Sequence, residues 1–215
     1  MFKTWSYTSW SNWKECPAKA KYQHIDKIPQ PKSFALEKGI MWHSELEEFL
    51  LDKRTEVPSA GYKFIPDLFR IKELGAIPEA EWGVTRDWSP VFWNNRNICG
   101  RAKVDVWYVN ENGVLTVIDF KTGKEYASHA FQASLYAVVG NLHLEIDKVQ
   151  TQMWYLETGN VTYADWSREK LLEELAVWKE RIDHMLSDEK LEPTPSREAC
   201  RWCPFKNGNP CNEQV

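Results

Sequence analysis

The sequence predicts a single α/β domain in which helices pack against a central sheet. A chain of 215 residues suits one compact core that buries roughly 70% of the unfolded surface. β-Branched and aromatic residues alternate in 102–109 and 114–121, as is typical of strands. Apolar residues recur at helical spacing in 33–51 and 167–187.

The composition limits the class of protein. Hydrophobic residues make up 43% and charged residues 27%, which excludes a disordered or fibrous chain. The net charge of −4 excludes a generally basic DNA-binding surface but not a local basic groove. Residues 1–43 carry seven lysines against three acidic residues, so the N-terminal segment is basic. Of the 12 tryptophans, we expect several in the core and others free to stack on a ligand.

Localisation follows from what the sequence lacks. No apolar run approaches the ~20 residues that span a bilayer, and the first ten residues lack the apolar core of a signal peptide. We therefore expect a soluble, cytoplasmic protein with no membrane contact. In a reducing compartment the five cysteines favour metal ligands or buried thiols over disulfides.

The N-terminal half predicts two helices. Residues 6–22 form the first, which ends near Pro17, and Ser33 caps the second, 33–51. The expected buried stripe of the second helix consists of Phe34, Ile40, Met41, Leu46, Phe49 and Leu50. Gly39 lies one turn before His43, and a mid-helix glycine costs about 1 kcal/mol relative to alanine, which suggests close approach of a backbone or ligand. From this helix alone, the favoured interpretation of His43 is a capping or partly buried histidine on an amphipathic helix.

The remaining elements alternate between loops, strands and helices. Residues 53–78 form a loop with one helix at 67–74, and 79–85 form a strand. A helix at 126–139 precedes two strands, 147–157 and 160–166. The last long helix, 167–187, turns six residues inward: Leu171, Leu172, Leu175, Trp178, Ile182 and Met185.

A hairpin at 100–123 carries the strongest functional signal. A three-residue loop at 111–113, with Gly113 left-handed, pairs Asn110 with Val114 and places Asp105 across from Asp119. Asp105, Asp119 and Lys121 then share one face. The opposite face holds Val104, Val106, Ile118 and Phe120. Because carboxylates that face each other repel, a divalent metal is the natural compensation.

These residue types suit metal-assisted phosphodiester hydrolysis. Carboxylates hold hard cations, which polarise a phosphate and lower the pKa of bound water. The lysine ammonium can orient the attacking water or stabilise charge on phosphorus. His43 would complete a coordination shell and shift preference from Mg2+ toward Mn2+. Glu81 either joins the carboxylates or is solvated, and the alternative for the whole set is a surface hairpin with scattered charges.

The ordered set of Gly39-x-x-x-His43, Asp105, Asp119-Phe120-Lys121-Thr122-Gly123 and Gln132-x-x-x-Tyr136 resembles the RecB-type branch of the PD-(D/E)XK nuclease superfamily. The resemblance covers roughly 6–140 and implies a restriction-endonuclease-like core, a mixed central sheet flanked by helices. It further implies that His43, Asp105, Asp119 and the Phe120 carbonyl bind Mg2+ or Mn2+. Lys121 is then the catalytic lysine, and Gln132 and Tyr136 line the site.

The cysteines extend this resemblance. Cys200-x-x-Cys203 and Cys211 offer three ligands in one loop, and Cys16 is the natural fourth. Coordination chemistry alone leaves zinc and iron–sulfur equally open. One early and three late cysteines resemble the CRISPR-associated RecB-like adaptation nucleases and the AddB type, in which a 4Fe–4S cluster joins the two chain ends. By this resemblance, 1–30 and 190–215 form the cluster-binding part of one nuclease domain and 33–187 its catalytic core, while Cys99 is a buried thiol.

Two functions remain open. The first is a Mg2+- or Mn2+-dependent deoxyribonuclease, an exonuclease on single-stranded DNA or DNA ends that serves recombination, repair, phage or CRISPR pathways. A helicase, a recombinase, a CRISPR integration partner or a second copy of the chain would be its partners. The alternative is a non-catalytic DNA- or partner-binding module with a structural four-cysteine site.

Overall fold

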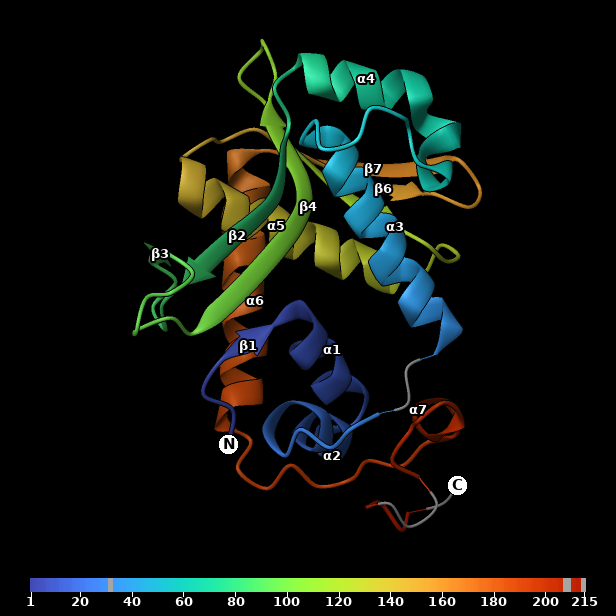
Figure 1. Cartoon of the computed structure of the whole chain (residues 1–215). Coiled ribbons are helices and arrows are strands. Elements are labelled where there is room, and N and C mark those ends of the chain that lie inside the picture. The colour runs from blue at the N-terminus through green and yellow to red at the C-terminus, as the bar shows by residue number, and fades with distance from the viewer. Residues whose placement is uncertain (31–32, 207–209, 214–215) are drawn as a thin grey trace.

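The computed structural model describes residues 1–30, 33–206 and 210–213 and contains a mixed seven-stranded sheet (Figure 1). The sheet order is β3-β2-β4-β5-β6-β7, and the short β1 pairs with β4. The strands are β1 (Trp5–Ser6), β2 (Ile77–Val84), β3 (Pro90–Val91), β4 (Gly100–Val109), β5 (Leu115–Lys121), β6 (Val149–Tyr155) and β7 (Asn160–Trp166). The helices are α1 (Tyr7–Glu15), α2 (Pro17–Ala20), η1 (Lys21–Ile25), α3 (Phe34–Leu50), η2 (Ser59–Phe64), α4 (Ile65–Glu73), α5 (Ser128–Leu144), α6 (Arg168–Ser187) and α7 (Arg197–Arg201).

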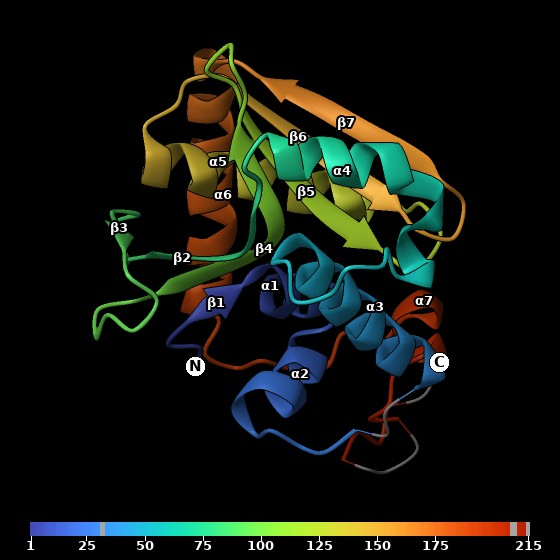
Figure 2. The same ribbon diagram turned by 45° about the horizontal axis from the view of Figure 1, so that its top comes forward.

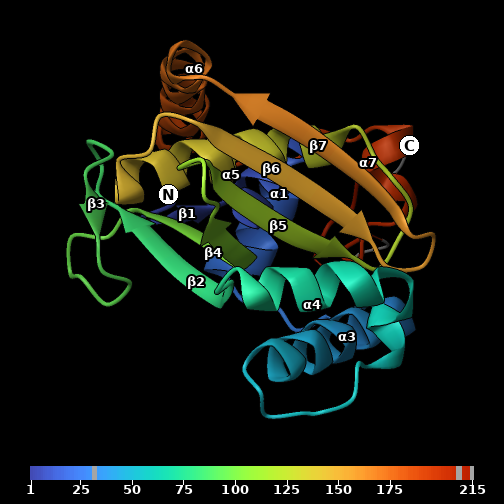
Figure 3. The same ribbon diagram turned by 90° about the horizontal axis from the view of Figure 1, so that it is seen from above.

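Helices cover both faces of the sheet (Figure 3). On one face α5, α6 and α1 enclose a core around Trp10, Leu135 and Trp178. On the other face α3 and α4 pack over Val106, Ile118 and Phe120. The predicted α/β sheet flanked by helices is therefore confirmed. None of the helices in the described ranges is long and apolar enough to cross a membrane.

The register of the central hairpin agrees with the prediction. Val106 pairs with Ile118, and Val109 pairs with Leu115. The Asn110 amide donates to the Val114 carbonyl at 3.0 Å, and Gly113 closes the loop with φ of +71°. Because the side-chain period of a strand is two, this register puts Asp105 and Asp119 opposite each other.

The sheet forks at Asp105. β5 pairs with β4 only from Val106 onward, whereas β1 pairs in parallel with the start of β4 at Gly100 and Arg101. The Phe120 amide therefore donates to the Asp105 carboxylate, at 2.7 Å, instead of continuing the ladder. On the other side of β4, Glu79 has φ of +55° and interrupts the pairing between β2 and β4.

The fork corrects one expectation about the hairpin faces. Val106, Ile118 and Phe120 belong to the core under α3 and α4, as expected for one face. Val104 packs instead in the core under α5. The prediction that all four share one face is wrong for Val104, because β4 changes face where the regular pairing with both neighbours stops.

The N-terminal helices differ in part from their predictions. The expected helix over 6–22 divides into α1, α2 and η1, because Pro17 cannot continue the α1 ladder and begins α2 instead. Ser33 caps α3 as predicted, with its hydroxyl accepting from the Leu36 amide. Leu46, Phe49 and Leu50 are buried, but the inward placement of three other apolar residues is wrong: Phe34, Ile40 and Met41 are exposed. In Figure 1 the N-terminal half of α3 runs away from β6 and β7, and among the described residues the core on this face includes no α3 residue before Trp42.

The C-terminal elements lie close to their expected ranges. β7 has the predicted bounds, and Gly159 turns the chain between β6 and β7 with φ of +79°. Ser167 caps α6, whose residues Leu171, Trp178, Ile182 and Met185 are buried. Leu172 is exposed, contrary to prediction, because it lies on the solvent side of the helix. In the predicted cysteine tail, residues 207–209 and 214–215 lie outside the described residues.

Candidate active site

The end of β5 presents a buried acid and a lysine to α5. Asp119 and Lys121 are two residues apart, so their side chains share a face of the strand. Lys121 Nζ lies 2.6 Å from Asp119 Oδ2, and both side chains are largely enclosed. Burial of such a pair is expensive unless each charge has a partner, and here each provides the partner of the other.

Across the fork, β4 supplies Asp105 and α3 supplies His43. Asp105 Oδ2 accepts from the Phe120 amide at 2.7 Å, and Oδ1 lies 3.1 Å from His43 Nδ1. The His43 ring also packs edge-on against Phe120, with 6.1 Å between the ring centroids. The backbone of β5 therefore holds the carboxylate of β4 next to the histidine.

A hydrogen-bond chain orients Lys121. The Lys103 carbonyl can only accept, so the Tyr136 hydroxyl donates to it at 2.8 Å. The hydroxyl oxygen then accepts from Gln132 Nε2 at 2.7 Å, which turns Gln132 Oε1 toward Lys121 Nζ, also at 2.7 Å. The same amide nitrogen lies 3.3 Å from Asp119 Oδ1. A backbone carbonyl of β4 thus sets the orientation of Gln132 and, through it, the position of the lysine.

The electrostatics of the site reflect its enclosure. Burial raises the pKa of Asp119, and the neighbouring charge of Asp105 raises it further, against the opposing effect of Lys121. Burial acts to lower the pKa of Lys121, but the charge and hydrogen bond of Asp119, together with the charge of Asp105, act against it, and this pKa is raised. For His43, burial is likewise outweighed by the hydrogen bond and charge of Asp105, and the pKa is raised. The site gathers negative charge that protons compensate when no cation is bound.

The donor set suits a hard divalent cation. It combines two carboxylates and an imidazole, and Asp119 Oδ2 makes no well-directed hydrogen bond within the described residues despite its closeness to Lys121. No three His, Cys, Asp or Glu side chains in the described ranges lie close enough to hold an ion as they stand. The side chains of Asp119 and Lys121 would therefore have to separate when a metal binds.

Not every predicted residue lies at the fork. Glu81 is exposed and pairs in register with Lys103, while Glu79 stands in the register position opposite Asp105 and forms an ion pair with Lys103 at 2.8 Å. The sequence reasoning also missed Tyr7 of α1, whose hydroxyl donates to the Ser128 carbonyl at 2.7 Å at the start of α5. Burial raises the Tyr7 pKa, which Lys121 lowers and Asp119 raises. No local spacing signals Tyr7, because it reaches the site from more than a hundred residues away.

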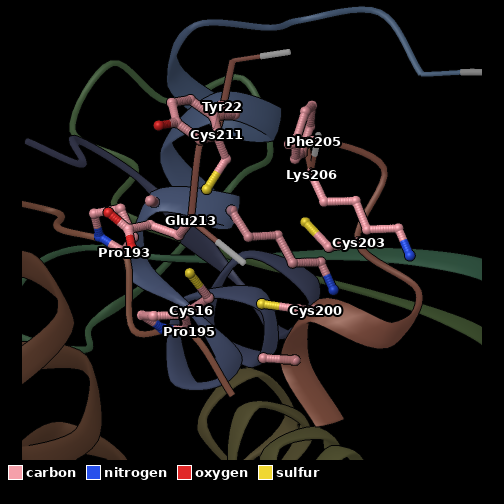
Figure 4. Close-up of a pocket in the computed structure, with 13 residues that line it drawn as sticks. Cys16, Tyr22, Pro193, Pro195, Cys200, Cys203, Phe205, Lys206, Cys211 and Glu213 are labelled. Carbon is pink, nitrogen blue, oxygen red and sulfur yellow. The ribbon is translucent and has the colours of Figure 1, made fainter. Parts of the chain in front are cut away.

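Four of the five cysteines line one pocket near the two chain ends. Cys16, Cys200, Cys203 and Cys211 surround it together with Tyr22 and Phe205, whose rings pack 5.4 Å apart. Figure 4 shows the four sulfur atoms around a common space, and in Figure 2 the segment that follows α6 runs past α2 toward α7. Cys99 is buried in the core, as predicted.

An α/β fold that presents two carboxylates and a lysine at a fork in its sheet defines a class of metal-dependent nucleases. The family model described as the PD-(D/E)XK nuclease superfamily matches residues 4–208, and the chain belongs to this superfamily. Its members use divalent metal ions such as Mg2+ or Mn2+, and DNA is the substrate that membership implies.

A solved structure shares the fold. A "putative exonuclease" from Eubacterium rectale is 13% identical, and the match covers 99% of this chain and 91% of that one with a TM-score of 0.59. The structure of SSO0001 is 15% identical over 94% of this chain and 84% of that one, with a TM-score of 0.46. No curated protein sequence matches the chain.

Proposed function

We propose that this chain is a Mg2+- or Mn2+-dependent DNA exonuclease that acts on single strands or free ends. The observation that carries the proposal is the buried Asp119–Lys121 pair, oriented by Gln132 and facing Asp105 and His43 at the fork of the sheet. Membership of a nuclease superfamily and the fold shared with the Eubacterium rectale protein support it.

Each residue has a role in this proposal. His43, Asp105, Asp119 and the Phe120 carbonyl would hold the cation, which when bound polarises the scissile phosphate and lowers the pKa of water. Gln132 would keep the Lys121 ammonium at the site, where it can orient the attacking water and stabilise charge on the phosphate. Gln132 and Tyr136 hold that ammonium in position. Glu81 is exposed and contributes through solvent at most.

We further propose that the chain belongs to the RecB-like iron–sulfur branch. The four pocket cysteines would bind a 4Fe–4S cluster that joins 1–30 to 190–215, around a catalytic core of 33–187. Coordination chemistry suits zinc as well, and the resemblance of one early and three late cysteines to the iron–sulfur branch is what favours the cluster over zinc.

The pathway and partners are part of the same proposal. A lone nuclease domain of this branch would serve DNA recombination or repair, a phage or a CRISPR system. A helicase, a recombinase, a CRISPR integration partner or a second copy would accompany it. A cytoplasmic location follows from a DNA substrate and a cluster that needs reducing conditions.

Cleavage assays test the catalytic site. Linear single-stranded DNA with a 5′ or 3′ label, linear duplex and circular single strands are incubated with Mg2+, Mn2+ or EDTA. We expect metal-dependent loss of linear single strands and survival of circles. Lys121→Met and Asp119→Asn should each reduce the rate at least a hundredfold, whereas Lys179→Met, at an exposed lysine of α6, should not. Full activity in either site variant would refute the assignment, and salt-sensitive binding without any cleavage would favour the non-catalytic module.

Iron analysis and absorbance test the cluster. Protein purified without oxygen should be brown, absorb near 400 nm and contain about four irons per chain. Cys16→Ser should lose the absorbance, while Cys99→Ser keeps it because Cys99 lies in the core and not in the pocket. A colourless protein that contains one zinc per chain would show that the four cysteines bind zinc and not an iron–sulfur cluster.

A further inference from the structure

A groove of about 520 Å³ opens beside the candidate active site and is not explained by the catalytic residues alone. One face of α3, from Leu36 to Glu47, forms its wall, and Glu79 and Thr122 complete it. His43 lies on the same wall, and Thr122 directly follows Lys121. Whatever occupies the groove therefore lies next to His43, a proposed ligand of the cation, and next to the residue that follows Lys121.

The two ends of the groove differ in chemistry. Leu36 and Ile40 line one end and are 52% and 58% exposed, although both are apolar. Glu47 and Glu79 line the other end, where carboxylates repel phosphates. Exposed apolar side chains that gather beside a groove mark a ligand surface. A DNA strand would thus find favourable contacts toward Leu36 and unfavourable ones toward Glu47.

The spacing along α3 matches a nucleotide strand. At 1.5 Å per residue, Ile40 lies about 4.5 Å and Leu36 about 10.5 Å from His43 along the helix axis. Stacked nucleotides repeat at about 3.4 Å, so these residues face the bases one to three nucleotides from a phosphate at His43. Since every nucleobase has an apolar face, such contacts need no particular sequence.

Gly39 leaves space in this groove between α3 and Thr122. It lies between Leu36 and His43 on the groove wall, and a Cβ atom there would lie 3.4 Å from Thr122 Oγ1. That distance is an ordinary contact, so alanine fits without displacing the chain, but it closes the space between α3 and Thr122. A glycine that weakens its own helix therefore leaves room for the substrate backbone.

We infer that the apolar end of this groove, formed by Leu36 and Ile40, binds the nucleobases next to the scissile phosphate, with Gly39 giving clearance to the DNA backbone. This inference rests on the proposed nuclease function and adds a base-contacting surface to it. The occupant is single-stranded DNA, because the groove reaches the proposed metal site at His43 and Thr122 and its apolar end suits unpaired bases.

Binding to DNA with and without bases tests the inference. Fluorescence anisotropy with Ca2+, at one salt concentration, compares a labelled 12-nucleotide single strand with an abasic strand of equal length and charge. The wild type should bind the base-containing strand about tenfold more tightly. The double variant Leu36→Ser/Ile40→Ser should keep the abasic affinity and lose most of the tenfold preference. Leu172→Ser is the matched control, since Leu172 is also 58% exposed but lies on α6.

A second variant separates substrate contact from helix stability. Gly39→Ala should raise the melting temperature by about 2–4 °C, because alanine favours the helix, and should weaken binding to both strands several-fold. A purely structural glycine would raise stability and leave DNA affinity unchanged, which would overturn the clearance role.

The outcomes distinguish this inference from the nuclease proposal. An unchanged base preference in the double variant, or none in the wild type, overturns the base-contacting surface even if cleavage is normal. A preference that the double variant abolishes, in a protein that never cleaves, refutes the nuclease and keeps the surface. If the double variant differs from the wild type only in the mass measured by sedimentation, the face with Leu36 and Ile40 joins two copies of the chain, and the inference fails.

Discussion

Replacement of Tyr136 by phenylalanine tests the hydrogen-bond chain that positions Lys121. The variant removes only the hydroxyl, which donates to the Lys103 carbonyl and accepts from Gln132. Both partners remain near a buried ring, and each unsatisfied polar group costs about 1–3 kcal/mol. Because Gln132 keeps a weaker contact to Asp119, we expect the free energy of unfolding to fall by about 2–3 kcal/mol in total. For a chain of this length that lowers the melting temperature by roughly 5–10 °C.

Thermal unfolding in EDTA measures this effect without metal. Tyr163→Phe is the matched control, because Tyr163 is 70% exposed on β7 and should change stability by no more than about 0.5 kcal/mol. Single-turnover cleavage should also slow in Tyr136→Phe, since Gln132 is then free to rotate away from Lys121. Burial holds the pKa of Tyr136 well above its usual value, so the unfolded state loses the phenol proton first, and the stability difference should narrow as the pH rises through 10. Equal melting temperatures for Tyr136→Phe and the wild type would refute the chain.

Three further predictions address the scaffold. Burial lowers the pKa of His129 to about 4, so as the pH falls the unfolded state binds the extra proton first. The free energy of unfolding should therefore fall as the pH drops from 6.5 toward 4. Urea titrations of His129→Gln should show a weaker dependence of this free energy on pH, and a dependence identical to that of the wild type would show that His129 is not its source. Gly113→Ala should cost about 1 kcal/mol because φ is positive there, whereas Gly123→Ala, without that constraint, should be nearly neutral in the same titration. Trp178→Ala should lower the free energy of unfolding by about 3–5 kcal/mol in chemical denaturation, because the Trp178 ring is fully buried. Trp202→Ala should not lower it, because that ring is exposed. Similar denaturation midpoints for the two variants would contradict the burial of Trp178.

Local sequence patterns predicted the elements whose conformation is set by residues close to one another in the sequence. The hairpin register follows from strand alternation and from a loop whose glycine alone adopts φ of +71° without strain. The start of α3 follows from the Ser33 hydroxyl, which satisfies a free amide within one turn. These interactions span a few residues, so the sequence contains all the partners.

The burial of α3 could not be predicted in the same way. Phe34, Ile40 and Met41 follow the apolar pattern of a buried stripe, yet all three are exposed, and the described core on this face begins in α3 only at Trp42. An apolar pattern states which side chains would gain from burial. It does not state whether a partner surface is within reach, since that depends on where distant strands end.

By itself the sequence predicted the candidate catalytic residues: spacing joined Asp119 to Lys121 and Gln132 to Tyr136, and the resemblance to the RecB-type branch added His43 and Asp105. Only the tertiary structure decided how they meet. The sheet forks at Asp105, the Phe120 amide leaves the ladder to bind that carboxylate, and the Lys103 carbonyl orients Gln132 through Tyr136. These contacts join segments that are far apart in the chain, and long-range pairing depends on how the whole sheet closes rather than on any local pattern.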